Sequence, residues 1–167
     1  VSETDENDVL ANQAPFYFDL SVKDIYQTLR NGCTTYIIAK KLFMFPTLLI
    51  DWLNNHKVTS LIWATSAFRM VADSGIFEKK RPQCLRQVIL GGEALQAKHL
   101  KIWKKAAPEC RFINLYGPTE VTVDCTYYKI ERDFANGEPI PIGKACRNME
   151  VILLGDDLKP VPDGEAG

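Results

Sequence analysis

Over the first two thirds of the chain, short runs of apolar and β-branched residues alternate with segments in which apolar residues follow a helical spacing. This alternation is the feature that most limits which folds the chain can adopt. The apolar runs predict strands within 8–18 and over 34–39, 58–63, 87–90 and 110–115. The segments between them predict helices from residue 21 to a stop at Gly32, and over 46–53, 66–72 and 96–107. The pattern is typical of an α/β fold, in which a largely parallel sheet carries helices on both faces.

The first helix has clear boundary signals. Ser21, followed three residues later by Asp24, predicts a side-chain cap at its start, and Gly32 predicts a left-handed residue at its end. The apolar residues that follow a helical spacing in this segment are Val22, Ile25, Tyr26 and Leu29.

The pattern changes after Glu120. Residues 121–130 read as a strand, and residues 136–167 are rich in proline and glycine, with one apolar strand expected over 150–154. We therefore expect an α/β part over residues 1–132 and a β-rich continuation over residues 133–167, truncated at its C-terminus.

Composition excludes several classes of function. With 46% apolar and 25% charged residues the chain is typical of a soluble globular domain, and 20 basic against 21 acidic residues provide no positive field for nucleic acid. The five cysteines are scattered and odd in number, which argues against a disulfide framework or a zinc site. His56 and His99 are interpreted as surface residues, so a cysteine–histidine nucleophile is not expected.

Location follows from what the sequence lacks. No apolar run is long enough to span a bilayer, and the acidic start has neither the basic nor the apolar region of a signal peptide. We expect a cytoplasmic protein with reduced thiols and with no membrane or nucleic-acid partner.

Unusual residues stand at the ends of three predicted strands, namely Asp19, the segment 91–93 and the segment 116–120. Ligands of parallel sheets bind at the carboxyl ends of the strands, so these positions are candidates for one site. Each also has a plain structural interpretation. Asp19 could be a helix-terminus acid satisfied by backbone donors, and the paired glycines and Gly117-Pro118 could be ordinary turns.

The segment from Asn114 to Glu120 gives the clearest indication of chemical function in the sequence. Tyr116 can stack on a flat base, and the Gly117-Pro118 break redirects the chain so that Thr119 and Glu120 can face phosphates. A carboxylate is the ligand type that Mg²⁺ prefers when it also holds substrate phosphates. The combination suits a nucleotide with a metal.

The whole segment, Asn-Leu-Tyr-Gly-Pro-Thr-Glu, resembles the Asn-x-Tyr-Gly-Pro-Thr-Glu motif of the adenylate-forming superfamily, specifically the amino-acid adenylation domains of nonribosomal peptide synthetases and the D-alanine ligases. Further segments match that family in the same order. They are Phe-Asp-Leu-Ser-Val at 18–22, Gly-Gly-Glu at 91–93, Pro-Ile-Gly-Lys at 141–144 and the stretch 158–167. The resemblance implies the large domain of such an enzyme.

The resemblance implies that ATP, or AMP after reaction, binds at the second and third strand ends. Gly92 and Glu93 would form one wall of the adenine pocket, Asn114 would hydrogen-bond the adenine edge, and Tyr116 would stack on the ring. Gly117 belongs to the same nucleotide-binding segment.

Thr119 and Glu120 are the implied catalytic residues, Thr119 through phosphate and Glu120 through Mg²⁺. The implied reaction joins an amino-acid carboxylate to the α-phosphorus of ATP, releasing pyrophosphate. The aminoacyl group is normally then transferred to the phosphopantetheine thiol of a carrier protein. Protein groups position and stabilise charge in this reaction, and no nucleophilic side chain is needed.

Substrate recognition is implied to centre on Asp19, which holds the α-amino group in the family. The residues that fall in the side-chain pocket are Leu20, Gly91, Leu115 and Val123, with the charged Lys23 and Asp124 at or near it. The D-alanine ligases typically carry cysteine where Gly91 stands, which argues against D-alanine, whereas Phe-Asp-Leu-Ser-Val and Asp24-Ile25-Tyr26 are similar to those enzymes. The choice of amino acid therefore stays open.

Three parts of the family pattern have no match in the sequence: a phosphate loop before this region, a later ribose-binding aspartate, and a C-terminal domain with a catalytic lysine. We therefore expect an internal piece that is inactive alone. Two other interpretations stay open. One is an acid-CoA or aryl-acid ligase of the same superfamily, and the other is a noncatalytic nucleotide-binding or scaffold module.

Overall fold

The computed structural model describes residues 2–162 and 164–166. Val1, Asp163 and Gly167, which lie in the leader and in the matched stretch 158–167, are outside the described residues. The described chain forms one seven-stranded sheet in the order β2-β1-β3-β4-β5-β6-β7. Its strands are β1 (Val9–Asn12), β2 (Thr34–Ile37), β3 (Ser60–Ala64), β4 (Gln87–Gly91), β5 (Arg111–Tyr116), β6 (Thr126–Lys129) and β7 (Lys144–Ala145).

The first five strands run parallel to one another, and β6 and β7 extend the sheet in antiparallel pairings. The predicted α/β class with a largely parallel sheet is therefore confirmed. The strand order reverses beside β1, because β2 lies on one side of it and β3 on the other. Such a reversal point is where open α/β sheets bind ligands, at the carboxyl ends of the strands.

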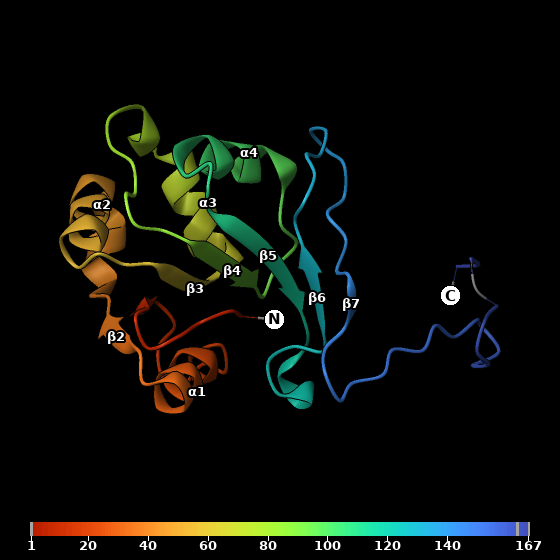
Figure 1. Ribbon diagram of the computed structural model, residues 1–167. Helices are drawn as coiled ribbons and strands as arrows, with labels where there is room; N and C mark the ends of the chain where they lie inside the picture. The colour runs from red at the N-terminus through yellow and green to blue at the C-terminus, as the bar shows by residue number, and fades with distance from the viewer. Residues whose placement is uncertain (1, 163, 167) are drawn as a thin grey trace.

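Helices cover both faces of the sheet (Figure 1). They are α1 (Ser21–Asn31), α2 (Pro46–Asn55), α3 (Thr65–Asp73) and α4 (Ala97–Ala106), with short 3-10 turns η1 (Lys40–Met44), η2 (Ile76–Glu78) and η3 (Thr119–Val121). The connection from β1 to β2 runs in the opposite direction along the sheet from the later connections. Because crossover connections are right-handed, α1 lies on one face and the other three helices lie on the opposite face.

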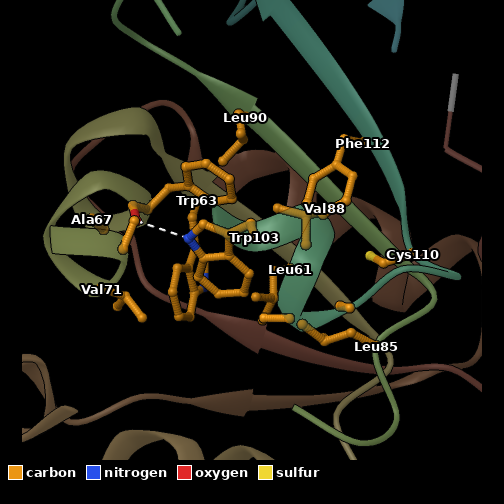
Figure 2. Packing of buried hydrophobic residues seen from close by; sticks show 14 of the residues in the cluster. Leu61, Trp63, Ala67, Val71, Leu85, Val88, Leu90, Trp103, Cys110 and Phe112 are labelled. Atoms are coloured by element: carbon orange, nitrogen blue, oxygen red, sulfur yellow. Dashed lines mark hydrogen bonds between the residues drawn. The ribbon is translucent and has the colours of Figure 1, made fainter. Parts of the chain in front are cut away.

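The larger core lies between the sheet and the helices α2, α3 and α4. Trp63 of β3 and Trp103 of α4 are both fully buried, and Figure 2 shows them among the aliphatic side chains of β3 and β4. Trp103 stacks on Phe68 with ring centroids 4.7 Å apart, and its Nε1 donates to the Phe68 carbonyl oxygen at 3.0 Å. This contact joins α3 to α4 and satisfies the only polar atom of the indole.

A smaller cluster covers the opposite face, where Leu10, Ile62, Ile89 and Ile113 project from four adjacent strands. The acidic leader runs along the amino-terminal edge of the parallel strands. Its Thr4 accepts a hydrogen bond from Gln87 at the start of β4, and its Glu3 pairs with Arg111 and Lys129. These ion pairs lower the pKa of Glu3, with Arg111 the larger cause.

The predicted cap of the first helix is wrong, although its end is right. Gly32 ends α1 at φ 70°, as expected, but Ser21 is the first helical residue and makes no capping bond. Its Oγ donates instead to the Phe18 carbonyl oxygen, at 2.8 Å. Asp24 is buried and accepts a hydrogen bond from Asn12 Nδ2 at 2.9 Å. The Asp24 bond ties the helix to β1, and the Ser21 bond ties it to the turn that precedes it.

Three further expectations differ from the structure. Leu154 makes only an isolated bridge with Pro160, so the predicted strand over 150–154 is absent from the described residues. The predicted strand over 121–130 is shortened to β6, because the chain first makes η3 and a bend. His99 is buried, with 1% of its surface exposed, and its Nε2 lies 3.0 Å from Asp73 Oδ1; the surface interpretation is wrong for this residue.

Candidate functional site

The first wall of the candidate site is the turn between β1 and α1. The Phe18 amide donates to the Pro15 carbonyl oxygen at 2.8 Å, and the Phe18 carbonyl accepts from Ser21. Leu20 is buried against the smaller core cluster. These contacts fix the turn from both ends and leave the Asp19 carboxylate half-exposed at its tip.

The second wall follows β5. The strand delivers Leu115 to the buried face and leaves the Tyr116 ring 52% exposed. Gly117 and Pro118 then turn the chain into η3, which begins at Thr119.

The two walls are joined by a hydrogen bond between predicted site residues. Thr119 Oγ1 donates to Asp19 Oδ2 at 2.6 Å, across 100 positions of sequence. A hydroxyl assigned to phosphate and a carboxylate assigned to an ammonium group therefore occupy the same small space.

A cleft of about 230 Å³ opens between these walls. Eight of the predicted site residues line it: Asp19, Leu20, Gly91, Gly92, Leu115, Gly117, Thr119 and Val123. Phe18, Pro118 and Asp124 complete the lining. The lining comes from the turn before α1, the end of β4 and the chain around the end of β5. The prediction that Asp19 directly follows a strand is wrong, because β1 ends at Asn12.

A strained turn closes the cleft on the side of β6. Thr122 and Val123 have φ values of 63° and 79°, which β-branched side chains rarely adopt. The turn packs directly on Gly117, where a Cβ would lie 2.3 Å from the Asp124 Cα. Only glycine fits at Gly117, and its lack of a side chain lets the strained turn bring Val123 into the cleft. Such strain often marks functional positions.

An ion pair braces the same turn against α1. Lys23 Nζ lies 2.7 Å from Asp124 Oδ1 and 2.8 Å from Oδ2. The two side chains are 22% and 9% exposed, so both charges are largely shielded from water. Lys23 and Asp124 are therefore paired with each other, and the sequence alone did not reveal this pairing.

The remaining predicted residues lie outside the cleft lining. Asn114 is buried, and its Nδ2 donates to the Pro141 carbonyl oxygen at 2.9 Å, which ties β5 to the Pro-Ile-Gly segment. Glu93, Tyr116 and Glu120 are exposed at the surrounding surface. Their assigned roles at the nucleotide stay predictions.

Sequence reasoning missed Phe18 and Pro118 as lining residues. Each is the direct chain neighbour of a residue that was assigned, Asp19 in one case and Gly117 and Thr119 in the other. A tight turn exposes consecutive residues to the same space, so neighbours within a turn are the signal that could have found them.

Glu120 is the residue predicted to bind Mg²⁺. The Glu120 carboxylate is exposed and makes no ion pair within residues 2–162 and 164–166. Those residues contain no cluster of three metal-binding side chains. One exposed carboxylate fits Mg²⁺, which commonly uses one or two carboxylates and completes its shell with phosphate and water oxygens.

Known proteins resemble this chain in sequence. A family model described as AMP-binding enzyme matches residues 1–167. The chain is 35% identical over 163 residues to the D-alanine–D-alanyl carrier protein ligase of Bacillus licheniformis, covering 95% of this chain and 32% of that protein. It is 33% identical over 158 residues to the L-proline–[L-prolyl-carrier protein] ligase of Pseudomonas fluorescens, covering 94% of this chain and 32% of that protein.

Solved structures give the same fold. IdnL7 superposes with a TM-score of 0.84 at 25% identity, over 96% of this chain and 33% of that one. The Vibrio cholerae adenylation domain AlmE, solved with glycyl-adenosine-5'-phosphate, superposes with a TM-score of 0.83 at 23% identity, over 97% and 31% of the two chains. The chain therefore spans about a third of the length of these relatives. No helix within its described residues is long and apolar enough to cross a membrane.

Proposed function

The chain belongs to the AMP-binding enzyme family, and from this we propose that the full-length protein containing it activates an amino acid with ATP. The product is an aminoacyl-adenylate, and pyrophosphate is released. We further propose that the aminoacyl group is passed to a carrier-protein thiol, because the D-alanine and L-proline relatives are both named as carrier-protein ligases. These two relatives act on different amino acids, so the proposal names the class of substrate and not one member.

The observation that carries the proposal is the hydrogen bond between Thr119 and Asp19. A half-exposed carboxylate in a small cleft is suited to an ammonium group, which donates three hydrogen bonds. When that ammonium binds, Asp19 has a charged donor to replace the Thr119 hydroxyl. Thr119 is then free to donate to a phosphate oxygen on its other side.

The rest of the cleft divides between the two substrates. Leu20, Leu115 and Val123 give apolar contacts for an amino-acid side chain, and Gly91 and Gly92 leave the backbone open to a close ligand. The exposed Tyr116 ring is available for stacking on adenine. Mg²⁺, held in part by Glu120, would neutralise phosphate charge when bound.

The proposed location is the cytoplasm. Its support is that all five cysteines are free, because reduced thiols are the rule in that compartment.

The test compares Asp19→Ala with the wild-type residue in the full-length protein, using pyrophosphate exchange with a panel of amino acids and of simple carboxylic acids. We expect a loss of about 100-fold or more with amino acids, because the bound ammonium loses its charged partner. Tyr17→Ala, which changes an exposed ring outside the cleft, is the matched control and should stay near wild type.

Three results would overturn the proposal. If Asp19→Ala kept its amino-acid activity, Asp19 would not hold the ammonium. If the wild-type protein exchanged pyrophosphate only with carboxylic acids that lack an amino group, the protein would be an acid-CoA or aryl-acid ligase. Absence of exchange with every acid would instead support a noncatalytic module.

A further inference from the structure

Two free thiols lie next to each other across the last two strands of the sheet. Thr126 of β6 is registered with Ala145 of β7, and Cys125 and Cys146 are the chain neighbours of that pair, just beyond the two strands. The Cys146 amide donates to the Cys125 carbonyl oxygen at 2.7 Å. Twenty residues of chain separate them, yet their backbones are in direct contact.

This spacing suits a disulfide. The two cysteines share one backbone hydrogen bond and not the two of a regular antiparallel pair, because the Cys125 amide donates to the Tyr116 carbonyl oxygen. That 2.7 Å bond keeps their backbones adjacent, and disulfides join residues whose Cα atoms lie about 4.4–6.8 Å apart. Both thiols are half-buried and so within reach of a small reagent, whereas Cys33 and Cys110 are buried. The pair is free in the structure.

The surroundings give the two thiols different characters. Cys125 Sγ donates to the Tyr116 carbonyl oxygen at 3.5 Å, at the end of β5. Cys146 Sγ lies 3.9 Å from Asp124 Oδ2. Burial raises the pKa of Cys146, and the Asp124 carboxylate raises it further. Cys146 is therefore the less reactive thiol towards a reagent in solution, and in the second step it must lose its proton before it attacks the adjacent Cys125 sulfur.

We propose that Cys125 and Cys146 are a two-electron oxidation site that takes a small-molecule disulfide. The Cys125 thiolate attacks the reagent and releases one reduced thiol, which leaves a mixed disulfide. Cys146 then attacks the Cys125 sulfur, releases the second reduced thiol and forms the Cys125–Cys146 bond. Two protons pass from the cysteines to the two released thiols, so the reagent is reduced by two electrons and the protein is oxidised by two.

The bond would act on the wall of the cleft. Cys125 follows the strained turn at Thr122 and Val123, and its amide nitrogen packs against Gly117. Linking it to Cys146 ties that turn to the end of β7 and places the cross-link beside Asp124. Transient disulfides in reduced compartments are typically catalytic or redox-sensing, and a site on the cleft wall fits the second role.

The test uses the reduced, folded chain with oxidised glutathione, followed by mass spectrometry and peptide mapping without reductant. We expect a loss of two hydrogens and a linked peptide pair containing Cys125 and Cys146. The yield should be at least tenfold higher in the folded chain than in urea, because folding holds the thiols together. This readout does not depend on catalysis. The cross-link can therefore fail to form while the proposed function holds, and it can form while the proposed function fails.

Single substitutions separate the steps. Cys125→Ser and Cys146→Ser should each stop at a glutathione adduct, and Cys84→Ser, which removes a half-exposed thiol elsewhere, should cross-link as wild type does. The proposal is overturned if the folded wild-type chain carries glutathione on both cysteines without linking them. It is also overturned if Cys84 links to either of them as readily as they link to each other.

Discussion

At the scale of single residues, two glycines of the cleft differ in whether a side chain can be added. A Cβ on Gly117 would lie 2.3 Å from the Asp124 Cα and 2.7 Å from the Cys125 nitrogen, whereas a Cβ on Gly91 would lie 3.6 Å from the Leu115 Cβ. The first approach is a collision between backbones and the second is an ordinary contact. Gly117 is therefore required by packing, and Gly91 leaves space that a ligand can use.

We predict that Gly117→Ala lowers the free energy of unfolding by about 1–3 kcal/mol or more. This is the usual cost of overpacking, and here neither the backbone at Gly117 nor the backbone at Asp124 can move away easily. Gly91→Ala is the matched control and should change the free energy of unfolding by less than about 1 kcal/mol. Urea unfolding of both variants measures the difference. Equal destabilisation by the two substitutions would contradict the close packing of the turn on Gly117.

A second residue-scale prediction concerns Asp24, whose Oδ1 has no hydrogen-bond partner among the described residues. Burial raises its pKa from 3.8 to about 7, while the hydrogen bond from Asn12 acts in the opposite direction. Because the folded state holds the proton more tightly than the unfolded state, stability from this group is complete below pH 3.8 and is lost as the pH rises through 7.

The size of this effect is about 2–3 kcal/mol between pH 5 and pH 8. Asp24→Asn should remove that part of the pH dependence and be more stable than wild type at pH 8. Asp156→Asn, at an exposed carboxylate, is the control and should leave the pH dependence as it is. Urea unfolding at the two pH values measures both. A wild-type slope retained in Asp24→Asn would show that another group is responsible.

At the scale of elements, periodicity located the strands and helices well but did not show which face of a helix is covered. The apolar residues of α1 identified the helix, yet Tyr26 is 66% exposed and Leu29 is 74% exposed, while the polar Ser21 and Asp24 are buried. Hydrophobic spacing shows only that one face of a helix differs from the other. Which residues become buried depends on tertiary contacts, and in α1 the hydrogen bonds of Ser21 and Asp24 bury polar residues.

The candidate site shows the same division. The motifs drew attention to Asp19 and Thr119, and the structure brings the two side chains together, although β1 ends at Asn12 and Asp19 lies in the turn before α1. The Lys23–Asp124 pair and the left-handed backbone of Thr122 and Val123 were not predictable. Both depend on how the turn after η3 folds back onto Gly117, which no local pattern encodes.

An element-scale prediction concerns the joint between α3 and α4. Trp103→Ala removes a fully buried ring and its hydrogen bond to Phe68, so we expect a loss of about 3–5 kcal/mol of stability. Ile102→Ala, at the neighbouring and 37% exposed position of α4, should cost about 1 kcal/mol or less. Thermal or urea unfolding distinguishes them. Similar losses in both would mean that α4 contributes little to the core through Trp103.

At the scale of the whole molecule, the chain has a packed core but an open site. Buried hydrophobic side chains cover both faces of the sheet, whereas Tyr116, Thr119 and Glu120 are exposed on one side of the cleft. Phosphoryl chemistry depends on charges held in a site from which water is excluded. A surface that gathers the proposed recognition residues without enclosing them would supply binding groups but exclude little water.

We therefore predict that the 167-residue chain, purified alone, folds cooperatively and makes no measurable adenylate, while the full-length protein does. The share of relatives that the chain spans, 32% for both carrier-protein ligases, supports this expectation, because their activity belongs to proteins about three times as long. Amino-acid-dependent pyrophosphate exchange by the isolated chain measures it, with the full-length protein as the positive control and Gly117→Ala as an unstable reference. Exchange by the isolated chain at a rate near that of the full-length protein would show that the open cleft is sufficient for the reaction, and that enclosure by the rest of the protein is not needed.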